Sequence, residues 1–231
     1  MQNSNEALIA ELERNIGFSF TNKELPLLAL THPSRTGELK KQRTESNQRL
    51  EFLGDAVLEL VVSDYLYSGH PDIEEGELTR MRASLVCEAA LCYCAEEIGL
   101  GNCLLLGKGE DSSGGREKPS ILSDAFEAVI GAVYLDAGFE AARKHIHTFV
   151  LDKVEEFTML KDGKSRIQEL VQQDSSATLN YETAAIGKTE DAHFRSVLYI
   201  NGEAVSTGEG RTKKAAEQKA ALAAIKLYQK E

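Results

Sequence analysis

The chain has 231 residues and a formal net charge of −11, and 42% of its residues are hydrophobic. This length and composition are typical of a folded protein with one or two domains, because a chain of this size can bury a substantial core. No segment reaches the roughly 18 consecutive apolar residues of a membrane span. The N-terminus also lacks a basic segment followed by an apolar one. We therefore expect a cytoplasmic protein with no membrane partner.

The negative charge is unevenly distributed along the chain. Residues 161–231 contain 11 basic and 10 acidic residues, whereas the preceding part contains 15 basic and 27 acidic residues. The net charge of the whole chain argues against a nucleic-acid partner, because phosphates repel an acidic surface. The C-terminal part has nearly equal numbers of basic and acidic residues, so its charge does not argue against binding to nucleic acid. The sequence thus indicates two parts of different electrostatic character.

The cysteines give no indication of a metal site. All four lie between Cys87 and Cys103, without the paired spacing of zinc ligands and without a histidine among them. We expect ordinary reduced thiols on or near a helix.

Residues 1–158 predict a series of helices. Apolar residues recur with helical spacing in 5–17, 22–32, 46–69, 75–101, 119–138 and 139–157. A polar, glycine-rich loop is expected at 108–118, and Gly138 is a plausible helix terminator. The pattern predicts an all-α domain.

After residue 158 the pattern changes. A short helix is expected at 165–173, and a closing Ala-rich helix at 212–230. Between them, three runs have the composition of strands, at 180–187, 193–202 and 203–210, and Asn201-Gly202 is the clearest hairpin signal in the chain. The sequence predicts an α+β multidomain protein. Its domains are 1–158 and 162–231, and a linker lies near 158–164.

Two pairs of carboxylates interrupt apolar helical segments. Glu51 and Asp55 lie one helical turn apart, and Asp124 and Glu127 are spaced i, i+3 on a second segment. Each pair could simply occupy a solvent-exposed face, which is the commonest place for charged residues. If the two pairs converge, they form an oxygen-rich cluster suited to Mg²⁺ or Mn²⁺. Metal-assisted phosphodiester hydrolysis is chemistry that such a cluster can serve.

Four segments resemble one known family. The stretch RLEFLGDAVLEL (49–60) resembles the signature of the ribonuclease III endonuclease domain, and PSILSDAFEAVIGAVYLDAG (119–138) is similar to that family's second carboxylate segment. The stretches ALTHPS (29–34) and EGELTRMRASLV (75–86) are similar to its flanking motifs, in the same order. The resemblance implies an all-α ribonuclease III catalytic domain over 1–158.

The same resemblance assigns roles to the carboxylates. It implies that Glu51, Asp124 and Glu127 are metal ligands, with Asp55 and Glu127 as catalytic residues. The implied cofactor is Mg²⁺, for which Mn²⁺ can substitute. Two further positions belong to the outer cleft by resemblance. Glu75 matches an acidic residue of the family, whereas Gln48 replaces the acidic residue that usually begins the signature.

The family acts as a homodimer in which an aromatic residue at the centre of the signature contacts the partner subunit. In this sequence that residue is Phe52. Packing in the core of its own subunit is the equally weighted alternative for a phenylalanine.

The C-terminal part resembles a double-stranded RNA-binding domain. Such domains read duplex shape over about 16 base pairs, through two minor grooves and the phosphates between them. A Lys-Lys pair alone would indicate only a solvated surface; the preceding strands favour binding. Glu190 falls where the family's loop usually has a histidine, and an acidic residue there would weaken the phosphate contact. The residues implied to bind RNA are Gln168, Glu169, Gln172, Arg211, Lys213 and Lys214.

Taken together, the residues and the resemblance predict a Mg²⁺-dependent endoribonuclease specific for double-stranded RNA. The resemblance implies products with 5′-phosphate and 3′-hydroxyl ends, and roles in processing ribosomal RNA precursors and structured messages. A non-catalytic dsRNA-binding protein that keeps the fold is the alternative. A carboxylate metalloprotein unrelated to RNA would leave the C-terminal domain unexplained.

Overall fold

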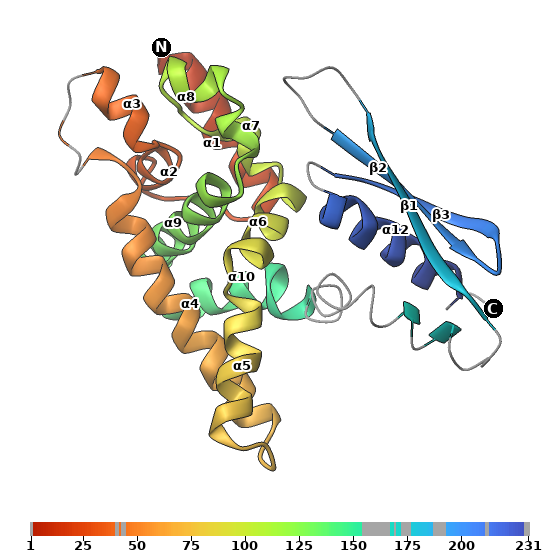
Figure 1. The fold of residues 1–231 in the computed structure, drawn as a ribbon. Coiled ribbons are helices and arrows are strands. Elements are labelled where there is room, and N and C mark those ends of the chain that lie inside the picture. Colours follow the sequence, from red (N-terminus) through yellow and green to blue (C-terminus); the bar gives the residue numbers. More distant parts are fainter. Residues whose placement is uncertain are drawn as a thin grey trace. The chain divides into compact units, whose positions relative to one another are not determined.

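The chain folds into two compact units, Met1–Lys153 and Val154–Glu231, shown as ribbons in Figure 1. The computed structural model describes residues 2–39, 42, 45–153, 167–168, 170–171, 177–186, 193–210 and 213–228. We call the two parts the helical unit and the sheet unit and describe each by itself. The expected linker at 158–164 lies outside the described residues, so the expected boundaries at 158 and 162 stay a prediction.

The helical unit confirms the predicted all-α class. Apart from one bridge between Thr31 and Leu105, its described part contains no β-structure. No helix described in either unit has the length and apolarity to cross a membrane. In chain order the elements are α1 (Gln2–Ile16), α2 (Glu24–Ala29), α3 (Pro33–Glu38), α4 (Gln48–Gly69), α5 (Glu75–Leu85), α6 (Glu88–Glu97), α7 (Leu100–Cys103), α8 (Lys108–Ser112), the 3-10 helix η2 (Gly115–Glu117), α9 (Pro119–Ala137), α10 (Phe139–Phe149) and the 3-10 helix η3 (Leu151–Lys153).

Helix α9 is the centre of the helical unit. Helices α2, α4, α6 and α10 all pack against it, and it is apolar on most of its circumference. Phe126, Val129 and Ile130 are completely buried. A helix with this composition is stable only inside a core, because an exposed apolar face costs free energy. The carboxylates that α9 carries are therefore surrounded by a rigid framework.

Helices α4 and α9 approach each other through glycine. A Cβ atom on Gly54 of α4 would lie only 1.8 Å from the backbone oxygen of Glu127. Across the same contact, a Cβ on Gly131 would lie 2.3 Å from the backbone oxygen of Leu50. Neither position can hold a larger residue without separating the helices. The two backbones are thus brought together at the positions that carry the two carboxylate pairs.

Two segments of the helical unit differ from the prediction. The single helix expected at 75–101 is divided into α5, α6 and α7, with Cys87 in an extended conformation between the first two. No glycine or proline lies in 77–98, so composition does not reveal this break. The glycine-rich segment expected as a loop contains α8 and η2. Arg116 holds it in place by donating hydrogen bonds to the backbone oxygens of Gly101 and Leu104, each at 2.9 Å.

The sheet unit contains the three predicted strands and the closing helix. β1 (Leu179–Ile186), β2 (His193–Ile200) and β3 (Glu203–Gly210) form an antiparallel sheet in the order β1-β2-β3, and α12 spans Lys213–Tyr228. Asn201 and Gly202 connect β2 to β3 with φ angles of 53° and 82°. Two successive positive φ angles suit a tight hairpin and favour this Asn-Gly pair. The hairpin prediction is confirmed.

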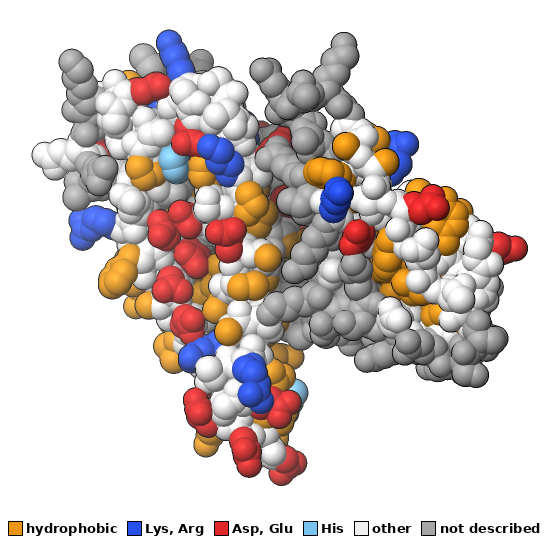
Figure 2. Space-filling view, viewed as in Figure 1, with side chains coloured by type: hydrophobic (Ala, Val, Ile, Leu, Met, Phe, Trp, Pro, Cys, Tyr) orange, Lys and Arg blue, Asp and Glu red, His pale blue; other side chains and the backbone are white. Residues whose placement is uncertain are grey.

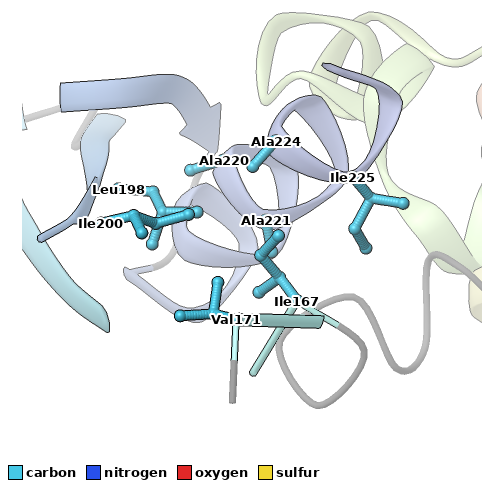
Figure 3. Close-up of a cluster of buried hydrophobic side chains, with 8 residues drawn as sticks. All are labelled: Ile167, Val171, Leu198, Ile200, Ala220, Ala221, Ala224 and Ile225. Atoms are coloured by element: carbon cyan, nitrogen blue, oxygen red, sulfur yellow. The ribbon is translucent and has the colours of Figure 1, made fainter. Parts of the chain in front are cut away.

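Helix α12 lies close to the sheet because its buried face consists largely of alanine. Figure 3 shows this face beside Leu198 and Ile200 of β2 and beside Ile167 and Val171. A Cβ on Gly208 of β3 would lie 2.2 Å from the backbone nitrogen of Ala220. The buried cluster comprises Ile167, Val171, Leu198, Ile200, Ala220, Ala221, Ala224 and Ile225.

We expect Gly54→Ala to destabilise the helical unit by about 1–3 kcal/mol, because the added methyl group overfills the contact between α4 and α9. Denaturant unfolding followed by circular dichroism measures the change. The matched control is Gly69→Ala at the end of the same helix, where a Cβ would meet no atom within 4 Å. Equal stability of the two variants would contradict the tight contact.

Candidate active site

Three of the four predicted carboxylates converge on one face of the helical unit. One oxygen from each of Glu51, Asp124 and Glu127 can be chosen so that all three lie within 4.8 Å of one another. Glu51 comes from the first turn of α4, and the other two come from α9. Figure 2 shows acidic side chains gathered over the middle of α4. The close contact at Gly54 explains the convergence, because it places the Glu127 backbone directly against α4.

Mutual repulsion and burial disfavour the ionised form of these carboxyl groups. Burial, followed by the charges of Asp55, Glu51 and Asp124, raises the pKa of Glu127 to about 8. Burial and the charges of Asp124 and Asp55 also raise the pKa of Glu51. The pKa of Asp124 is raised mainly by burial. Within the described part of the chain, the surroundings of these groups therefore do not fully stabilise their ionised forms.

This donor set fits a divalent cation. Among the described residues, no Lys or Arg forms an ion pair with Glu51, Asp124 or Glu127. Three half-buried carboxylates without a protein counterion are expensive unless a cation is bound. Oxygen-only ligands suit hard ions such as Mg²⁺. The cluster is thus a possible metal site, and the assignment of each ligand remains a prediction.

Asp55 lies at the edge of the cluster. It is exposed on α4 and does not belong to the group of three. Its charge nevertheless contributes to the raised pKa of Glu51 and of Glu127. Asp55 is therefore a charged neighbour of the cluster, and its expected catalytic role remains a prediction.

The outer residues expected from the resemblance lie on α4 and α5. Gln48 is exposed in the first turn of α4. Glu75 is exposed in the first turn of α5 and accepts a hydrogen bond of 2.9 Å from the Thr79 hydroxyl. The side chain of Phe52 is 79% exposed, which rules out packing in the core of its own subunit. Contact with a partner subunit remains a prediction for this residue.

Of the six expected RNA-binding residues, the structure describes the side chains of two. Gln168 is exposed, and Lys213 is exposed at the first position of α12. Lys214 follows in the helix, but its side chain is outside the described part, as are Glu169, Gln172, Arg211 and Glu190.

His32 lies near the carboxylate cluster. It belongs to the 29–34 motif, but its sequence context alone predicts no functional role for it. The Ser34 backbone N–H donates to its Nδ1 atom at 3.2 Å, and the Ser34 hydroxyl lies 2.8 Å from the same atom. Burial lowers the pKa of His32, while the charges of Glu110 and Asp124 oppose this effect. His32 is thus a neighbour of Asp124, a predicted metal ligand.

Comparisons with known proteins identify the family of each unit. A family described as Ribonuclease-III-like matches residues 22–154, and the double-stranded RNA binding motif matches 164–228. Proteins named Ribonuclease 3 from Bacillus cereus and Bacillus anthracis are each 45% identical over 217 residues, which are 93% of this chain and 89% of either relative.

A solved structure gives the same result for the helical unit. The nuclease domain of ribonuclease III from Campylobacter jejuni is 43% identical, with a TM-score of 0.56, and the match covers 61% of this chain and 97% of that one. From these matches, the chain belongs to the ribonuclease III family of double-strand-specific endoribonucleases.

Proposed function

We propose that this protein hydrolyses phosphodiester bonds in double-stranded RNA with Mg²⁺ as its cofactor, and that Mn²⁺ can substitute. The observation that supports this most directly is the convergence of Glu51, Asp124 and Glu127 on one face. Their oxygens would hold the ion. The ion would supply Lewis-acid polarisation of the phosphate and charge stabilisation of the leaving oxygen.

The chain's own residues have separate tasks in this proposal. Glu127 and Glu51 bring negative charge to the ion from two helices whose spacing is fixed by Gly54. Asp55, exposed beside them, is the residue that can contact water or substrate at the open side of the site. Attack of water on phosphorus with loss of the 3′ oxygen leaves 5′-phosphate and 3′-hydroxyl ends. Gln48 and Glu75 would contact the RNA further out.

The sheet unit would hold the duplex. Lys213 lies at the N-terminus of α12, where a cationic side chain and the helix dipole both favour phosphate. Gln168 is exposed and would contact the minor groove, together with Glu169 and Gln172. Separation of the binding domain from the acidic catalytic domain allows a protein of net charge −11 to bind RNA.

We propose further that two copies form a symmetric dimer through α4. Phe52, Leu60 and Tyr67 are 79%, 58% and 77% exposed, and their spacing places them along one side of this helix. Large exposed apolar side chains in a row indicate a contact surface. The related Campylobacter jejuni nuclease domain is described as having a region involved in dimer formation. A two-fold axis would bring this stripe against its copy.

The alternative is a dsRNA-binding protein without nuclease activity. Such a protein has no need for uncompensated carboxylates in a half-buried site, whereas this chain keeps all four central ones. The proposed cellular roles, processing of ribosomal RNA precursors and of structured messages in the cytoplasm, follow from the family.

Glu127→Gln should abolish cleavage of labelled duplex RNA while leaving duplex binding unchanged, because it removes a metal ligand and leaves the sheet unit intact. A gel assay with Mg²⁺ or EDTA, using duplex and single-stranded RNA, measures both properties. The wild-type protein should cut only the duplex, and only with metal. Retention of the duplex without cutting in either Mg²⁺ or Mn²⁺ would favour the non-catalytic alternative.

Replacing Lys213 and Lys214 together by Ala should weaken binding to all duplexes alike. The slope of log affinity against log salt concentration should fall by about 1 for each lost phosphate contact. Lys219→Ala is the control, since Lys219 is exposed further along the same helix. If the double variant and the control bind alike, α12 does not make the phosphate contacts.

In EDTA, Glu127→Gln should stabilise the protein increasingly as the pH rises from 4.5 to 8. The unfolded carboxyl group ionises near 4.5, whereas the folded one holds its proton to about 8. The folded state therefore binds more protons in this window, and wild-type stability falls with rising pH. Thermal unfolding of both proteins at pH 5 and pH 8 measures the effect. A difference in melting temperature that does not grow with pH would contradict the coupled cluster.

A further inference from the structure

A third acidic residue of α4 continues the row of carboxylates. Glu51, Asp55 and Glu59 follow one another at intervals of four residues, so they lie along one side of the helix. Glu59 is not one of the residues expected to act in cleavage. Burial is the largest cause of the raised pKa of Glu127, and the charge of Glu59 is the smallest of the contributing charges. The geometric link is the helical row itself, which places Glu59 one turn beyond Asp55.

Arg82 of α5 holds Glu59. The Arg82 Nε atom lies 2.9 Å from Oε2 of Glu59, and its NH1 group donates a hydrogen bond of 3.0 Å to the Ser63 hydroxyl. Ser63 in turn donates to the backbone oxygen of Glu59 at 2.6 Å. A guanidinium group with two partners on consecutive turns of α4 has a defined orientation, because its donors are arranged in a rigid fork.

The Arg82 side chain also faces the outer cleft. A cavity of about 250 Å³ lies between α4 and α5, and its lining includes Ser63, Tyr67, Glu75 and Arg82. The side chains of Arg82 and Glu59 are 39% and 37% exposed. An ion pair this exposed contributes little to stability. The pair has a larger effect on the local electrostatic potential than on stability. Arg82 is always charged, and Glu59 lies in the same helical row as Glu51 and Asp55.

We propose that Arg82 is a positioning residue that sets the affinity of the carboxylate cluster for its divalent cation by neutralising Glu59. This inference rests on the proposed metal-dependent function. With the pair intact, the positive charge of Arg82 offsets the contribution of Glu59 to the electrostatic potential at the cluster. Without Arg82, an uncompensated carboxylate attracts the cation more strongly; without Glu59, an uncompensated guanidinium repels it.

The test compares the wild type with Arg82→Gln, Glu59→Gln and the double variant. Calorimetric titration of the RNA-free protein with Mn²⁺ gives the affinity, and cleavage assays give the Mg²⁺ concentration for half-maximal rate. Arg82→Gln should bind metal about threefold to tenfold more tightly, and Glu59→Gln more weakly by a similar factor. The double variant should return to within about twofold of the wild type, as expected for coupled charges.

A purely structural role for Arg82 gives a different pattern. If Arg82 served only to attach α5, both single variants would shift metal affinity in the same direction and the double variant would not recover; either result overturns the inference. Arg80→Gln is the matched control, because Arg80 is exposed on the same helix and has no ion pair with any other described residue. It should change Mn²⁺ affinity by less than about twofold, and a shift as large as that of Arg82→Gln would also overturn the inference.

The same experiment separates this inference from the proposed function. Glu127→Gln is included as the reference for loss of the metal site. If it leaves Mn²⁺ affinity unchanged, the proposed metal site is wrong. If it removes binding while the Arg82 and Glu59 variants behave alike, only the regulation by Arg82 is wrong.

Discussion

The contact between α4 and α9 is the constraint on which the rest of the helical unit depends. Because Gly54 and Gly131 have no side chains, the two backbones lie closer together than ordinary helix packing allows. This proximity brings acidic residues of two distant chain segments to one place. A cluster of half-buried like charges is unfavourable in itself, so the apolar packing around α9 must hold it together. Stability and chemistry are thus linked at a single interface.

Much of this arrangement can be predicted from the sequence. The spacing of Glu51 and Asp55, and that of Asp124 and Glu127, gives each pair a common face through the helical period alone. Asn201-Gly202 specifies its turn because few other pairs tolerate two positive φ angles. These features depend on local geometry, which is encoded within a few neighbouring residues.

Other features depend on contacts that no local pattern contains. The break at Cys87 has no glycine or proline to mark it; the division arises from the way α5 and α6 pack on different neighbours. The approach of Arg82 to Glu59 joins residues 23 positions apart on separate helices. The exposure of Phe52 likewise follows from the orientation of α4 against α9, since either a buried or an exposed site suits its side chain. Tertiary packing decides each of these cases.

The raised pKa of Glu127 has a consequence for how the site fills. At neutral pH the empty cluster retains a proton there, and a carboxyl group must lose its proton before it can coordinate a cation. Loading the site is therefore an exchange in which an ion enters and hydrogen ions leave. Protons and the metal ion then compete for the same carboxylate oxygens. The measured heat of metal binding includes the heat with which the buffer takes up the released protons.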